Sequence, residues 1–71
     1  MNIKIDTEFI KLDQLLKFSD IVPSGGIAKE VIQDGLVSVN GEECTMRGKK
    51  IRSGDTVVIE FDDETFEIKV D

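Results

Sequence analysis

Residues 24–42 read SGGIAKEVIQDGLVSVNGE, and within this stretch the spacing of apolar residues changes from helical to alternating. The helical part has apolar residues at positions 27, 28, 31 and 32, which lie on one face of a helix. Ser24 is an N-cap residue at the start of this helix, and Gly35 stands where a C′ glycine ends it. The first half of the stretch therefore predicts an amphipathic helix.

The second half of the stretch predicts a β-hairpin. Val37 and Val39 alternate with a serine, which is typical of a strand with one buried face. Asn40-Gly41 follows directly and favours a type I′ turn, because both central residues of that turn need positive φ. A return strand is expected to run through Cys44 and Met46.

Upstream of this stretch, the sequence predicts a short strand and a second helix. A strand is expected at residues 3–5, where isoleucines alternate with a lysine. Phe9, Leu12 and Leu16 then recur at helical spacing, so a short helix is expected from about residue 9 to 18. The helix is expected to end at the serine and aspartate that follow.

Downstream, the apolar residues alternate again and predict two further strands, whose shared faces hold Val57, Ile59 and Phe61, and Phe66, Ile68 and Val70. Turns are expected at residues 53–55 and 62–64. All four phenylalanines stand in or beside apolar stripes, so no aromatic platform for base stacking is expected. The predicted fold class is α+β, with two short helices packed on a small, mainly antiparallel sheet.

Length and composition limit the function classes. A chain of 71 residues is expected to form a single domain over residues 1–71 with a thin core. It has no His, Tyr or Trp and one Cys, so it lacks a nucleophile and base pair, a zinc cluster and an internal disulfide. We expect no enzyme activity, no cofactor and no small-molecule substrate. With no export signal and no membrane-spanning run, a reducing cytoplasmic setting is expected.

The formal net charge is −6, but the charges are unevenly distributed. Residues 60–71 hold six acids and one lysine, which leaves a net charge of only −1 for the rest of the chain. Residues 47–52, Arg-Gly-Lys-Lys-Ile-Arg, hold four cations and no acid. Local potential governs electrostatic binding as much as net charge does, so this basic run is a candidate anion-binding segment. A solvated turn that carries lysines for solubility is the alternative.

The start of the helix predicted within residues 24–42 is a second candidate anion-binding segment. Gly25 and Gly26 leave backbone N–H groups unobstructed at the positive end of the helix dipole, where a phosphate could approach. Lys29 lies one turn further along and could reach the same anion. Taken alone this signal is weak, and an entry loop whose glycines only satisfy backbone geometry is the simpler interpretation. Cys44 has no activating His or second Cys and is expected to be a packing residue.

Four ordered segments carry a resemblance to a known family. They are Leu12–Phe18, Ser24–Ile32, Gly35–Glu42 and Gly48–Asp55. Together they resemble the S-four-type RNA-binding domain, also called the alpha-L motif, with a motif core at about residues 10–61. Within that family the chain looks most like the stand-alone bacterial YaaA-like and YbcJ-like proteins.

The resemblance implies binding of structured RNA, ribosomal RNA in particular, without catalysis. The contacts it carries over lie at polar or basic motif positions, and are Ser24, Lys29, Asn40, Arg47, Lys49, Lys50 and Arg52; with Gly25 and Gly26 these form the expected site. Many relatives have arginines at positions 25 and 26, and the closest subfamily usually has one at position 46, so this surface carries less positive charge than is usual. A monomer is expected.

A β-grasp-like protein interaction module is the alternative function. Residues 39–42 and 53–59 also resemble those small proteins. Their sulfur-carrier chemistry needs a C-terminal Gly-Gly, whereas this chain ends Val70-Asp71, so only an interaction role would remain.

Overall fold

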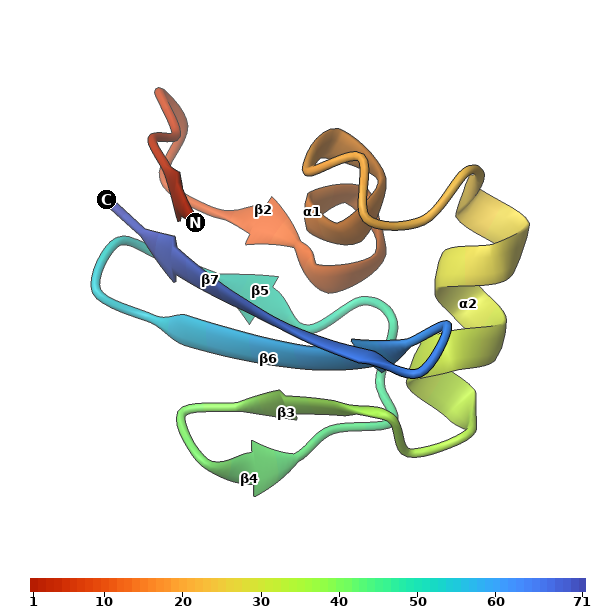
Figure 1. Cartoon of the computed structure of the whole chain (residues 1–71). Helices are drawn as coiled ribbons and strands as arrows, with labels where there is room; N and C mark the ends of the chain where they lie inside the picture. Colours follow the sequence, from red (N-terminus) through yellow and green to blue (C-terminus); the bar gives the residue numbers. More distant parts are fainter.

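The computed structural model describes all 71 residues. In chain order the elements are β1 (Asn2–Ile3), β2 (Ile10–Lys11), α1 (Leu12–Phe18), α2 (Gly25–Gln33), β3 (Val37–Val39), β4 (Glu42–Glu43), β5 (Lys50–Ile51), β6 (Thr56–Phe61) and β7 (Glu64–Val70) (Figure 1). Five strands form one sheet in the order β1-β7-β6-β3-β4, and β2 pairs with β5 in a separate two-stranded sheet. Only the β1–β7 pair is parallel, which confirms the predicted α+β class with a mainly antiparallel sheet.

The core is entirely aliphatic and joins both helices to the sheets. All 15 buried residues are hydrophobic, and they include Leu12, Leu15 and Leu16 from α1 and Ala28, Val31 and Ile32 from α2. The helices pack on each other, with α1 above the main sheet and α2 beside it in Figure 1. Neither helix is long and apolar enough to cross a membrane.

The predicted caps and turns of the 24–42 stretch are confirmed. The Ser24 hydroxyl accepts a hydrogen bond from the Ile27 N–H at 3.3 Å, and Gly35 ends α2 with φ of 78°. Asn40 and Gly41 both have positive φ, 52° and 87°, as a type I′ turn requires. Local side-chain chemistry is enough to specify these features.

The predicted start of the first helix is wrong by three residues. α1 begins at Leu12, because Ile10 and Lys11 form β2 and pair with Ile51 and Lys50. The first N–H groups of a helix need acceptors from outside it. The Lys11 side chain provides no cap, and the Leu12 N–H instead donates to the Lys49 carbonyl at 2.9 Å.

The predicted return strand through Cys44 and Met46 is also wrong. β4 ends at Glu43, although the Cys44 N–H still donates to the Val37 carbonyl at 2.9 Å. The chain then leaves the sheet toward the start of α1. Met46 is 66% exposed, so it does not share a packed face with Cys44, which is half-buried against the core as expected.

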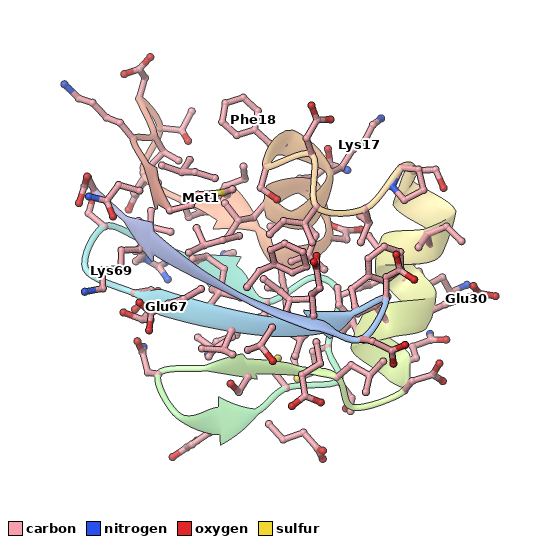
Figure 2. The ribbon with its side chains drawn as sticks, viewed as in Figure 1. Met1, Lys17, Phe18, Glu30, Glu67 and Lys69 are labelled. Atoms are coloured by element: carbon pink, nitrogen blue, oxygen red, sulfur yellow. The ribbon has the colours of Figure 1, made fainter.

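Phe18 lies beside the apolar face of α1 and not in it. It is 67% exposed, and Figure 2 shows it projecting from the end of the helix away from the sheet, as Lys17 does. The buried face of α1 is made by the leucines at 12, 15 and 16. Residue 18 follows Leu12 by six positions, or about 240° around the helix axis, and so points away from that face.

Candidate nucleic-acid interface

The basic run, residues 47–52, is anchored at the start of α1. The Asp13 N–H donates to the Arg47 carbonyl at 3.1 Å, next to the bond between Leu12 and Lys49. The backbone of the run thus supplies acceptors to the helix, while the side chains of residues 47, 49 and 50 remain exposed. The backbone contacts therefore fix where these cations stand.

Pairing of β2 with β5 adds a cation that the sequence prediction missed. Lys11 lies directly opposite Lys50 in the antiparallel register, and both are exposed. Ile10 lies opposite Ile51, which is fully buried. Since successive residues of a strand point to opposite faces, this small sheet has one apolar face toward the core and one cationic face outward.

Phe9 is a second residue that the prediction missed. It directly precedes β2 and is half-buried. The Lys50 Nζ lies 4.9 Å from the centroid of its ring and the Arg52 Cζ lies 5.8 Å from it. Both distances are within the range of a cation–π interaction. No sequence signal could have found either Phe9 or Lys11, because their neighbours lie about 40 positions away in the chain.

A groove of about 610 Å³ lies between the β3–β4 hairpin and the basic run. Four of the nine predicted site residues line it, namely Asn40, Lys49, Lys50 and Arg52. Glu42, Glu43 and Asp55 line it too, together with Cys44 and Met46. We call this hollow the basic groove, after the three cations on its basic-run side.

Asn40 and Asp55 connect the hairpin turn to the basic run. The Asn40 side chain donates to Asp55 Oδ1 at 2.9 Å and accepts from the Thr56 N–H at 2.9 Å. The Arg52 N–H donates to Asp55 Oδ2 at 2.8 Å. The bonds from Arg52 and Asn40, in that order, lower the pKa of Asp55 against the effect of burial, with smaller contributions from the charges of Lys49 and Arg52. Asn40 is therefore a structural link within the groove.

The start of α2 is open but lies outside the basic groove. Ser24, Gly25, Gly26 and Lys29 are exposed, and none of them lines the groove. A Cβ at position 25 would meet no atom within 4 Å, so a side chain would fit there. In Figure 1 this end of α2 lies at the top of the helix, beside the α1–α2 connection, and away from β5.

A second hollow is acidic and shares no lining residue with the basic groove. It is lined by Leu36, Phe61 and Thr65 with the four acids Glu60, Asp62, Asp63 and Glu64, which we call the acidic end. The basic groove lies near Thr56, where β6 begins, and the acidic end lies where β6 ends. Five residue steps of a strand span about 17 Å, about twice the screening length of about 8 Å at physiological salt.

No group of three or more His, Cys, Asp or Glu side chains is arranged to hold a metal ion. The acids of the acidic end are exposed, and Asp62 and Asp63, with φ of 54° and 63°, form the turn between β6 and β7. The turn expected at residues 62–64 is thus present at 62 and 63, and Glu64 begins β7.

The chain is similar to proteins of known families. The model of the S4 domain matches residues 3–69. The probable ribosome maturation protein RlbA of Bacillus subtilis (strain 168) is 48% identical over 58 residues, which cover 82% of each protein. The RQC P-site tRNA stabilizing factor of Listeria innocua is 34% identical over 62 residues, or 87% of this chain and 66% of that protein. The factor of the same name from Halalkalibacterium halodurans is 31% identical over 61 residues, or 86% and 68%.

Proposed function

We propose that this chain, which belongs to the S4 domain family, binds structured ribosomal RNA through the basic groove and acts there without catalysis. The family is an RNA-binding one, and the names of the relatives place them at ribosome maturation and at P-site tRNA. The observation that carries the proposal is the gathering of Lys49, Lys50 and Arg52 along one side of the groove, at the opposite end of β6 from the acidic end. The protein would act as a monomer in the cytoplasm, where ribosomes are assembled.

The proposed contacts are with phosphates. Lys49 and Lys50 would act as point charges, while the planar guanidinium of Arg52 can bind a phosphate through two parallel hydrogen bonds. Each phosphate neutralised releases condensed counterions, which makes the affinity dependent on salt. Arg47 is exposed beside the groove and would add a further contact from the same segment.

The acids of the groove would determine which side of the groove the RNA backbone contacts. Glu42 and Glu43 are exposed on β4, the edge strand on the other side of the groove. Their charges repel phosphates, so the RNA backbone would lie along residues 49–52 rather than across the hairpin. Asp55 also carries a negative charge, and two hydrogen bonds from Asn40 and the Arg52 N–H hold its carboxylate in place.

We also propose that the start of α2 is a second, weaker part of the RNA surface. Support comes from the family resemblance and from the open first turn, where Gly25, Gly26 and Lys29 are exposed. The Ser24 hydroxyl already caps the helix, so its contribution would be to hold the free N–H groups toward a phosphate. Asn40 would contribute through the position it gives the loop.

Fluorescence anisotropy with labelled ribosomal RNA fragments, from low to moderate salt, tests the proposed function. With roughly three to five phosphate contacts, log K should fall against log salt with a slope of about −2 to −4. An unstructured oligonucleotide of the same length serves as the control and should bind more weakly. Absence of binding even at low salt would contradict the proposal.

A further inference from the structure

We propose that Phe9 is a positioning residue of the RNA-binding surface, whose ring holds Lys50 and Arg52 side by side in front of phosphates. This inference rests on the proposed function and adds to it a residue that carries no charge. Phe9 would act through the two cations, without a contact of its own to the RNA.

The geometry around the ring carries the inference. The Lys50 Nζ is 4.9 Å and the Arg52 Cζ is 5.8 Å from the centroid of the Phe9 ring. Phe9 precedes β2 and Arg52 follows β5, so the antiparallel register of these strands continues to bring them opposite each other. Lys50 lies in β5 and Arg52 stands just past its end, and both side chains reach the same ring. One ring thus lies within cation–π distance of both cations.

The backbone on both sides of this contact is fixed. On the phenylalanine side, the Thr7 hydroxyl donates to the Phe9 carbonyl at 2.8 Å. On the other side, the Arg52 N–H is held by Asp55 at 2.8 Å, and Ile51 is fully buried between the two cations. The fold therefore fixes the backbone positions from which the ring and the two cations reach each other.

Without the Phe9 ring, repulsion between cations would destabilise the outer face of the β2–β5 sheet. Lys11 lies opposite Lys50, and like charges directly across a strand pair destabilise it. The negative face of an aromatic ring attracts cations electrostatically, so the Phe9 ring offsets part of this repulsion. It also restricts two flexible side chains before RNA arrives, which reduces the ordering cost of binding. Lys50 and Arg52 remain exposed and keep N–H groups free for phosphates.

A double-mutant cycle tests the role of Phe9, with anisotropy on the same ribosomal RNA fragment. Phe9→Leu removes the ring and keeps an apolar side chain, and we expect it to weaken binding about two- to fivefold. Phe9→Tyr keeps the ring and should bind as the unmodified chain does. In a Lys50→Gln, Arg52→Gln background, Phe9→Leu should cause no further loss. Phe66→Leu, which removes another half-buried ring on β7, is the matched control and should bind normally.

The salt slope separates a positioning role from a direct contact with phosphate. Phe9→Leu should keep the slope, because no phosphate contact is removed, whereas Lys50→Gln with Arg52→Gln should lower it by about 1.4 to 1.8. The inference is overturned if Phe9→Leu binds normally, or if its loss persists undiminished in the double glutamine background. Failure of the unmodified chain to bind, or normal binding by the double glutamine variant, would instead contradict the proposed function of the groove.

Discussion

The two ends of β6 differ in charge and in how their side chains are held. At the basic groove, Asp55 is tied to Asn40 and to the backbone of Arg52, and the cations stand on a segment anchored to α1. At the acidic end, four carboxylates stand on and around a hairpin turn and are exposed. One acid of the groove, Asp55, is thus built into the hydrogen bonding of the fold, whereas the acids at the far end are left to solvent.

This difference shows why a net charge of −6 does not argue against RNA binding. The two ends of β6 lie about 17 Å apart along the strand, or about two screening lengths at physiological salt. A phosphate at the groove therefore responds mainly to the charges of the groove itself, where cations and acids line opposite sides. The acidic end would keep the RNA from binding at the wrong end of the molecule.

Charge reversal in the basic groove should have the largest effect on RNA affinity. Lys49→Glu with Lys50→Glu removes two phosphate contacts, and at about 0.1 M salt it should weaken RNA binding roughly 40-fold and lower the salt slope by about 1.4 to 1.8. Anisotropy titrations at several salt concentrations measure both quantities.

The control makes the same type of charge reversal outside the groove. Lys17 is exposed on α1 and projects into solvent (Figure 2), and Lys17→Glu should change the affinity about twofold or less. An equal loss per reversed charge at the groove and at Lys17 would show that RNA responds to overall charge and would remove the distinction between the two ends.

Asn40→Ala should lower the stability of the protein, because Asn40 links the two sides of the basic groove. The change removes the two side-chain hydrogen bonds to Asp55 and Thr56 and places alanine at φ of 52°. We expect unfolding free energy to fall by about 1 to 2 kcal/mol, measured by urea denaturation. Asp63→Ala, which puts alanine at a similar φ of 63° at the acidic end, controls for backbone strain and should cost less. Equal costs would mean that the hydrogen bonds of Asn40 contribute nothing.

Substitutions at the start of α2 test whether the RNA surface extends beyond the groove. Lys29→Glu should lower the salt slope by about 0.7 to 0.9, and Gly25→Arg, for which there is space, should tighten binding several-fold. Opposite changes in affinity would support a continuous surface. Unchanged binding by both variants would confine the RNA to the groove.

The smallest expected effect is the pH dependence of stability that arises from the Asp55 carboxyl. Its pKa is lowered in the folded protein, so its contribution is present above the ordinary value of 3.8 and is lost as the pH falls through the folded value. Urea denaturation of the unmodified chain and of Asp55→Asn between about pH 2 and 6 measures this. The difference in stability between the two should shrink as the pH falls below 3.8; a constant difference would show that the charge of Asp55 is unimportant.

Features that depend on neighbours in sequence were predictable. Ser24 caps α2, Gly35 ends it, and Asn40-Gly41 makes the hairpin turn, because each residue satisfies its own backbone or that of the next turn. The alternation in residues 56–70 likewise matches the buried faces of β6 and β7, including Val57 and Ile68.

Features that depend on distant contacts were not predictable. Helical spacing at Phe9 and Leu12 suggested one continuous helix, but pairing of Ile10 with Ile51 turns the first three residues out of it. The same pairing brings Lys11 and Phe9 to the cations of the basic run. At the candidate site, the basic run could be recognised from the sequence. The groove, the Asn40–Asp55 hydrogen bond and the separation from the acidic end could be recognised only in the folded structure.

Amide NMR of the labelled chain, titrated with a ribosomal RNA fragment, tests most directly whether the basic groove rather than the acidic end meets RNA. At 71 residues, signals from both ends of β6 can be followed in one experiment. We expect the largest shift changes at residues 47–52 and around Asn40, and none beyond experimental error at residues 60–64. Shift changes centred on residues 60–64, with residues 47–52 unaffected, would contradict the account.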